Sequence, residues 1–304
     1  MKKSKTQYLF RKSPLMVCIL LVFTILTPEY GYSWGFEPHK RINRTACLLL
    51  PKPLFGFYKK HIEYITEHAV DPDKRRYTDT NEAVRHYIDL EDYYEFTLPI
   101  DTIPWTYDSA VLKYGKTHLT TYGNLPWNIF FNIHALKNAF IKGDVNAILK
   151  ISADLGHYVA DAHVPLHTTS NYDGQLTNQK GIHGLWETLT PTLFMDTLLV
   201  LNYTPEFLNP LMPSIWNMIH DSHELLPLVL SGEKEAKQRI PESQILELKL
   251  DKNQMKQQYS SMFISTYHST QQGAVETRYI QASKSVANCI YTAWILAGEP
   301  KLPE

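Results

Sequence analysis

Three histidines and one aspartate are concentrated in the stretch GHYVADAHVPLH, residues 156–167. His157 and Asp161 are four residues apart, so on a helix they share one face about one turn apart. Pro165 favours a helix end before it, and His167 then follows in the next segment. Two side chains fixed on a helix and a third on the following loop form an arrangement that suits metal ligands.

A second pair, His183 and Glu187 in GIHGLWETL, repeats the four-residue spacing. A buried carboxylate is costly unless a partner charge lies beside it, and a divalent cation is the simplest such partner. A single histidine is more often an ordinary hydrogen-bonded residue. Two histidine–carboxylate pairs joined through His167 instead favour a metal site.

Other histidines are interpreted as ordinary residues. The stretch IHDSHELL offers His220, His223 and Glu224 on an expected amphipathic helix, but no third group follows nearby, so we interpret it as a solvated face. His163 lies two residues past Asp161 and is expected to point away from the Asp161 face.

Apolar residues at three- and four-residue steps predict helices over residues 55–69, 126–144, 144–163 and 273–300. Asp144 is the expected N-cap of the helix that carries His157, and Gly298 with Pro300 is the expected stop of the last helix. TLLVLNY is the one strand-like stretch. These patterns predict an all-α fold, with a single multi-helix domain over residues 34–304.

The N-terminus has the pattern of an export signal. A basic segment, MKKSKTQYLFRKSP, precedes the apolar run LMVCILLVFTILTP, and Gly31 and Ser33 are small residues suited to signal peptidase. The run is short for a membrane span, so residues 1–33 are interpreted as a cleaved signal peptide rather than an anchor. We therefore expect export to a periplasm or to the extracellular medium.

Composition restricts the function little. The net charge is −1, which indicates no global basic field for nucleic acid, although a local groove in a neutral protein can still bind phosphates. Cys47 and Cys289 remain after cleavage. The sequence leaves open whether they pair, and each is expected to be a small buried hydrophobic residue.

The ordered motifs resemble those of the superfamily that joins bacterial zinc-dependent phospholipase C to the single-strand-specific zinc nucleases. Its core motif is His-x₃-Asp-x₅-His followed by His-x₃-Asp/Glu. Five residues match that motif without a gap: His157, Asp161, His167, His183 and Glu187.

Upstream residues extend the resemblance. Mature members of the superfamily begin with tryptophan, and the expected cleavage places Trp34 first. His39 matches a metal-binding histidine that follows shortly after. An aspartate about fifteen residues before another histidine is matched by Asp71 and His86, with Asp73 as the alternative aspartate.

The resemblance implies three zinc ions. Their ligands would be Asp71, His86, His157 and one Asp161 oxygen for the first; His167, His183 and Glu187 for the second; and the Trp34 amine and carbonyl, His39 and the other Asp161 oxygen for the third. Nitrogen and oxygen ligands of this kind suit Zn²⁺, and manganese or iron also accept them.

The resemblance further implies an exported enzyme that hydrolyses phosphodiester bonds, with Asp71 as the carboxylate that doubles as a base. RHYIDLED and the spacing from Trp34 to His39 resemble the nuclease branch, whereas Glu187 matches phospholipase C. The substrate is thus either a phospholipid headgroup or single-stranded nucleic acid, and no stable protein partner is implied. The alternative is a non-catalytic exported helical protein that binds zinc.

Overall fold

The computed structural model describes residues 35–93, 102–198, 203–251 and 254–302. The described residues all belong to one compact unit, Gly31–Glu304. The expected signal peptide and Trp34 lie outside the described residues. Within the described residues, no helix combines the length and the apolar character needed to cross a membrane.

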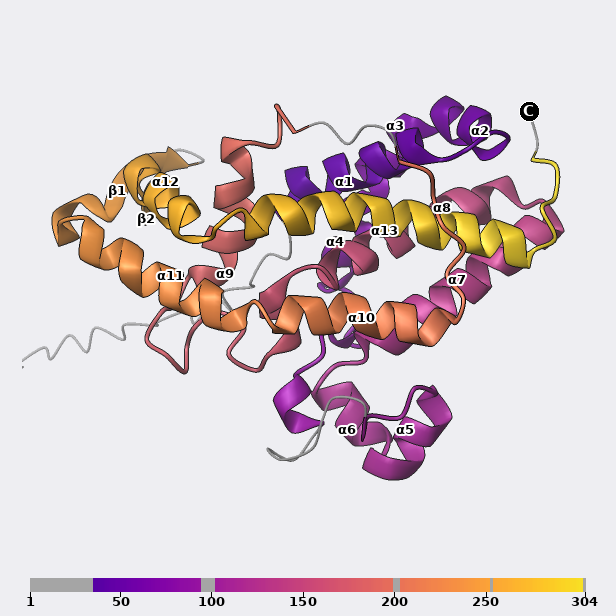
Figure 1. The fold of residues 1–304 in the computed structure, drawn as a ribbon, viewed down its shortest axis with the longest axis horizontal. Coiled ribbons are helices and arrows are strands. Elements are labelled where there is room, and N and C mark those ends of the chain that lie inside the picture. Colours follow the sequence, from indigo (N-terminus) through magenta and orange to yellow (C-terminus); the bar gives the residue numbers. More distant parts are fainter. Residues whose placement is uncertain (1–34, 94–101, 199–202, 252–253, 303–304) are drawn as a thin grey trace, which may run out of the picture. The chain divides into compact units, whose positions relative to one another are not determined.

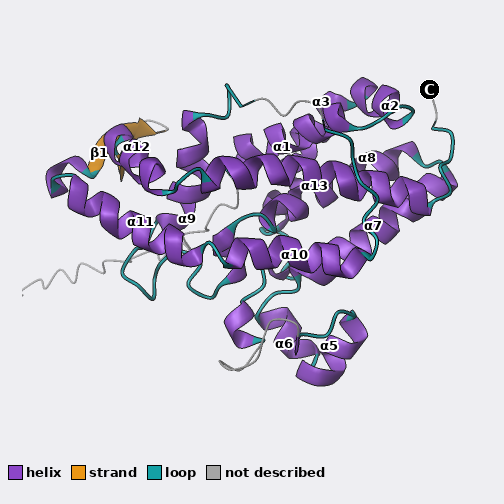
Figure 2. Ribbon diagram, in the orientation of Figure 1, coloured by secondary structure: helices purple, strands orange, loops and turns teal. Residues whose placement is uncertain are grey.

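Helices make up most of the described structure, which confirms the expectation of a mainly α-helical fold (Figure 2). The α-helices are α1 (Phe36–Leu49), α2 (Leu54–Lys60), α3 (Ile62–Glu67), α4 (Asp71–Arg75), α5 (Tyr107–Tyr114), α6 (Lys116–Thr121), α7 (Leu125–Lys142), α8 (Val145–Asp161), α9 (Ile182–Gly184), α10 (Leu211–His223), α11 (Leu226–Arg239), α12 (Ser261–Thr270) and α13 (Ala274–Leu296).

Single turns of other helix types connect these elements. The 3₁₀ turns are η1 (His68–Val70), η2 (Ala83–Arg85), η3 (Leu90–Asp92), η5 (Pro165–Thr168), η7 (Thr190–Leu193) and η8 (Glu242–Gln244), and η6 (Leu185–Leu189) is a π-helical turn.

Two helix boundaries agree with the local signals. The Asp144 side chain accepts a hydrogen bond from Ala147 N at 3.0 Å and so caps α8, as expected. After α13, Gly298 has a φ of +83°, a conformation that favours glycine and ends the helix.

The prediction of one continuous helix over residues 55–69 is wrong. The chain leaves α2 and begins α3 at His61, whose φ of −107° and ψ of 15° are not helical. Both short helices pack against α1, and the break at His61 allows each to do so.

A short antiparallel hairpin departs from the all-α expectation. Strand β1 (Leu246–Asp251) pairs with β2 (Gln254–Tyr259). Most of TLLVLNY lies outside the described residues, and its described ends, Thr197 and Tyr203, are not in a strand. The leucines of LELKLD alternate with charged residues, which is the pattern of a half-buried strand. This short stretch was not identified from the sequence, because helical periodicity dominates the rest of the chain.

The core gathers around α13, the last helix. It packs against α1, α7 and α8, and Figure 1 shows it running alongside α1. Helix α8 in turn packs against α7 and α1. Cys47 of α1 and Cys289 of α13 are both buried free thiols, so neither is in a disulfide. Both cysteines are thus buried, as expected for small hydrophobic residues. Burial raises the pKa of each thiol to about 12.

Gly156 allows α1 and α8 to approach closely. A Cβ at this position would lie 2.1 Å from the side-chain oxygen of Asn43, and Asn43 Nδ2 donates to Ala153 O at 3.1 Å. His39 lies one turn before Asn43, and His157 follows Gly156 directly. This contact therefore brings His39 of α1 against His157 of α8, and their rings stack with centroids 4.0 Å apart.

Candidate metal centre

Asp161, the last residue of α8, lies among four histidines from four segments. Its Oδ2 is 3.0 Å from His86 Nδ1 and 3.4 Å from His157 Nε2. Its Oδ1 is 3.4 Å from His39 Nε2 and 4.0 Å from His167 Nε2. The carboxylate is completely buried. Each of its oxygens thus faces a different pair of imidazoles.

Three sets of residues could each hold one cation. Within each set, one nitrogen or oxygen atom per residue lies within 4.8 Å of the others. The sets are His39, His157 and Asp161; Asp73, His86 and His157; and His167, His183 and Glu187. We call these eight residues together the histidine–carboxylate cluster.

The third set forms where the chain leaves α8 and folds back. His167 lies in the η5 turn, His183 in α9 and Glu187 in the π-helical turn η6. Glu187 Oε1 is 3.1 Å from His183 Nε2, and Glu187 Oε2 is 3.4 Å from His167 Nε2. Single π-helical turns are frequent at functional sites, and here the turn carries a completely buried carboxylate.

Backbone carbonyls orient three of the histidines. Nδ1 of His157 lies 2.9 Å from Ala69 O, and Nδ1 of His183 lies 2.9 Å from Tyr172 O. Nδ1 of His167 lies 2.6 Å from His86 O. An imidazole that donates from Nδ1 keeps its Nε2 lone pair for a metal, so these contacts select the tautomer that a ligand needs.

His86 has the opposite orientation, and Glu82 explains why. His86 directs Nδ1 into the cluster, 3.0 Å from His157 Nε2, and its Nε2 is 3.6 Å from Glu82 Oε1. Glu82 also accepts from Arg85 Nη1 at 2.8 Å and from the Tyr158 hydroxyl. Glu82 was missed in the sequence, although its four-residue spacing to His86 matches that of the other histidine–carboxylate pairs.

Asp173 positions the segment that carries His183. Its Oδ1 accepts from Gly181 N at 3.0 Å and from His183 N at 3.3 Å. Burial raises the pKa of Asp173 despite these donors. This carboxylate lies in the loop between the two motifs and also was not found from the sequence.

The structure places Asp73 in the cluster and Asp71 outside it. Asp73 Oδ1 is 3.7 Å from His157 Nε2 and 3.8 Å from His86 Nδ1. Asp71 instead contacts His68 Nδ1 at 2.5 Å and Lys74 Nζ at 3.0 Å, and its carboxylate is partly exposed. Residues two apart on a helix point to nearly opposite sides, so only one of the two can face inward from α4. Asp71, the expected ligand and base, is therefore not in the cluster, whereas Asp73, the alternative aspartate, is.

The pKa values of the two aspartates shift in opposite directions, in agreement with their different surroundings. Burial raises the pKa of Asp73. Burial alone would also raise the pKa of Asp71, but hydrogen bonds from His68 and Lys74 lower it overall. Asp73 is therefore a costly buried carboxylate even with Arg76 Nη1 3.7 Å away, whereas Asp71 is an ordinary, partly exposed ion-paired one.

Charges within the cluster are strongly coupled. Burial alone would raise the pKa of Asp161, but the charges of His157 and His167 hold it well below its usual range. Burial lowers the pKa of His157 well below its usual value, with His39 adding to the effect. For His86, Asp161 and Glu82 outweigh burial and raise the pKa to about 9. A cation that binds here must therefore displace a proton from His86 at neutral pH.

Unsatisfied polar atoms indicate that the cluster suits cations. Within the described residues, both carboxylate oxygens of Asp73 and of Glu187 are buried without a hydrogen bond, as are Nε2 of His167 and Nε2 of His183. Buried carboxylates of this kind are costly unless paired with positive charge. Their oxygen and imidazole atoms are the ligand types that zinc uses. The donor set thus fits divalent cations.

Of the remaining predicted residues, Trp34 lies outside the described residues. Its neighbour Gly35 is buried, and a Cβ there would lie 2.5 Å from the Thr188 side chain, directly after Glu187. His220 pairs with Glu224, at 3.5 Å on a solvated face, as expected. His223 was expected on the same face but instead contacts Thr168, with Nδ1 3.0 Å from the hydroxyl, beside His167.

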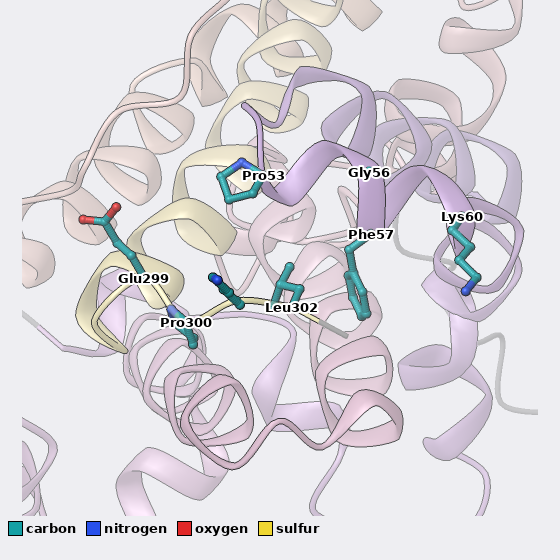
Figure 3. Close-up of a pocket in the computed structure, with 8 residues that line it drawn as sticks. Pro53, Gly56, Phe57, Lys60, Glu299, Pro300 and Leu302 are labelled. Atoms are coloured by element: carbon teal, nitrogen blue, oxygen red, sulfur yellow. The ribbon is translucent and has the colours of Figure 1, made fainter. Parts of the chain in front are cut away.

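The cavities that we describe lie away from the cluster. One of them, with a volume of about 550 Å³, lies between α2 and the residues after α13. Phe57, Lys60 and Leu302 border it (Figure 3). A second lies beside α7 and a third beside α10 and α13. None of the three is lined by a member of the histidine–carboxylate cluster.

A scan against protein-family models found no match, and a search of curated proteins found none either.

Proposed function

We propose that this protein is a zinc-dependent phosphodiester hydrolase, similar to the superfamily of zinc-dependent phospholipase C and the single-strand-specific zinc nucleases. The observation that carries the proposal is the position of Asp161, whose two oxygens each face a pair of histidines. One carboxylate so placed can be shared by two cations. The buried carboxylates of Asp73 and Glu187, whose oxygens make no hydrogen bond among the described residues, support the same conclusion.

Three cations would be held as follows. Asp73, His86 and His157, with one Asp161 oxygen, form the first set, and the second is His167, His183 and Glu187. His39 and the other Asp161 oxygen belong to the third, which the Trp34 amine would complete. The position of Gly35 supports this, because the backbone directly after Trp34 lies close to the Thr188 side chain and so near Glu187.

The chain's own residues would bind the cations and orient the histidines of the cluster. Carbonyl groups fix the tautomers of three histidines, Glu82 lies 3.6 Å behind His86 Nε2, and Asp173 holds the loop before His183. When bound, zinc supplies a Lewis acid that polarises a phosphoryl oxygen and lowers the pKa of water towards neutrality. Phosphodiesters suit such a centre, because their negative charge increases during the reaction.

The test uses the protein that begins at Trp34. It should hydrolyse bis-p-nitrophenyl phosphate, lose turnover on treatment with a chelator, and regain it with zinc. Asp161→Asn should remain folded by circular dichroism and fail to regain turnover. Full turnover after complete metal removal would contradict the proposal, and zinc binding without turnover would favour the non-catalytic alternative.

The substrate branch needs a second panel. Parallel assays with single-stranded DNA, RNA and phosphatidylcholine vesicles would separate a nuclease from a phospholipase.

Export and the role of the Trp34 amine belong to the same proposal. A free α-amine has a pKa of about 7.7–8.0, so a metal can displace its proton at neutral pH. A variant with extra residues before Trp34 should bind two zinc ions instead of three, because its Trp34 has no free amine. Native mass spectrometry would count the bound ions. The same extension at the C-terminus is the matched control. Three ions retained in the first variant would contradict the amine as a ligand.

A further inference from the structure

A cavity of about 550 Å³ lies between the segment before His86 and helices α5, α6 and α7. Its volume is in the range of small-molecule sites. Helices α5 and α6 border it on one side, and α7 supplies its longest wall. It is distinct from the histidine–carboxylate cluster, because none of its lining residues belongs to that cluster.

Aromatic rings form one side of this cavity. Tyr107 of α5 packs edge-on against Trp127 and Phe131 of α7, with ring centroids 6.2 Å and 5.6 Å apart. The Trp127 Nε1 donates to Trp105 O at 3.0 Å, so that indole is fixed and otherwise buried. Phe131 is 48% exposed, which leaves ring surface available to a ligand.

Side-chain amides form a second side. Asn124, Asn128 and Asn132 follow one another at four-residue steps, which places them along one face at the start of α7. Asn132 Nδ2 donates to both Asn128 O, at 2.9 Å, and Asn128 Oδ1, at 3.1 Å. Asn128 Nδ2 donates to Arg85 O at 3.4 Å. The amide nitrogen of Asn132 is thus used within the protein, and its Oδ1 remains as an acceptor.

Acceptors of this kind select a ligand that donates hydrogen bonds. A hydroxyl group donates and accepts, whereas a phosphate diester only accepts. An exposed ring face beside side-chain oxygens therefore suits a molecule with both a C–H face and hydroxyl donors.

The charge around the cavity disfavours a polyanion. Arg85 is already paired with Glu82 at 2.8 Å and lies 3.8 Å from Asp79. Lys116 is the lining cation that makes no ion pair among the described residues. Binding of a nucleic acid strand requires several phosphates to be neutralised by cations. One unpaired lysine does not provide that.

We propose that this cavity is a carbohydrate-binding site. A pyranose ring would stack its C–H face on Phe131 and donate hydroxyl hydrogen bonds to Asn132 and its neighbouring amides. The site is independent of the metal centre, so the proposal does not rest on the proposed function.

The test measures binding of maltohexaose, cellohexaose and chitohexaose to the purified protein by isothermal titration calorimetry. At least one should bind saturably at millimolar concentrations. Phe131→Ala should weaken binding by about tenfold, and Asn132→Ala by about threefold to tenfold. Phe207→Ala is the matched control, because Phe207 is 42% exposed and does not line the cavity.

Two further arms decide the outcome. Asp161→Asn should leave sugar binding unchanged while metal content falls, which separates this site from the metal centre. Phe131→Ala should not abolish any binding of decathymidylate, because the nucleic acid should not use this cavity. The proposal is overturned if none of the three hexasaccharides binds, if sugar binding is indifferent to Phe131, or if decathymidylate binds through Phe131.

Discussion

Two buried polar regions meet at the end of α8, and their hydrogen bonding differs. Arg278 of α13 is 2% exposed. Its Nη2 donates to Met218 O at 2.7 Å, its Nε to His163 O at 3.2 Å and its Nη1 to Gln281 Oε1 at 2.8 Å. Burial lowers the pKa of Arg278 to about 10, which still leaves the guanidinium charged at neutral pH.

The histidine–carboxylate cluster lies at the same helix end and has the opposite character. Its carboxylates Asp73 and Glu187 are as well buried as Arg278 but make no hydrogen bond among the described residues. A buried polar group that is fully paired stabilises the fold, whereas one left unpaired costs free energy unless a ligand satisfies it. The difference between the regions therefore separates a structural site from a cluster that suits a bound cation.

The largest effect is expected at Asp161, because both oxygens face ligand histidines. Asp161→Asn should remove two ions, whereas His39→Ala should remove one. Native mass spectrometry of the zinc-loaded proteins would count the ions. Equal single losses in the two variants would contradict the bridging role.

Arg278→Met should destabilise the fold strongly, because the carbonyl of His163 would lose its Arg278 donor and the buried contacts of the guanidinium with Met218 O and Gln281 would be lost. We expect a loss of about 3–5 kcal/mol in the free energy of unfolding, measured in urea.

The control is Arg239→Met, which removes an exposed pair with Glu235 and should cost less than about 1 kcal/mol. If the two substitutions cost the same, Arg278 is not the structural group that its contacts indicate.

The two aspartates of α4 provide a matched pair. Asp73→Asn should weaken zinc binding by at least about tenfold and, in chelator, should stabilise the fold, because burial of this carboxylate outweighs the charges of Arg76 and the nearby histidines and raises its pKa. Asp71→Asn should leave zinc affinity nearly unchanged. Competition with a chromophoric chelator and urea denaturation would measure both quantities. A larger affinity loss from Asp71→Asn would restore the original assignment.

The smallest effect is expected at Glu82, which acts through His86. Burial alone would raise its pKa, but His86, Tyr158 and Arg75 lower the pKa to about 2. Because the folded pKa is below the unfolded value of about 4.3, ionised Glu82 stabilises the fold above pH about 4.3. That contribution is lost as the pH falls towards 2.

Glu82→Gln should therefore lower the melting temperature at pH 7, and the difference from the unaltered protein should shrink below pH 4. Differential scanning calorimetry across that range is the measurement. A difference that stays constant with pH would show that the carboxylate charge is not involved.

Local signals in the sequence determined much of the site. The four-residue spacings of His157 with Asp161 and of His183 with Glu187 place each pair on one helical face, whatever surrounds them. The Asp144 cap and the Gly298 stop are also local, because their hydrogen bonds and backbone angles involve only nearby residues. Such features depend on a few adjacent positions and can be predicted from them.

Only the tertiary structure decided which side of α4 faces inward, and hence Asp73 instead of Asp71. The sequence offers two acidic residues at similar spacing to His86, and only the packing of α4 beside α8 distinguishes them. The break at His61 and the cavity beside Phe131 likewise depend on segments that meet across long chain separations. The free energy that fixes them comes from burial and close packing between those segments, which no short stretch of sequence contains.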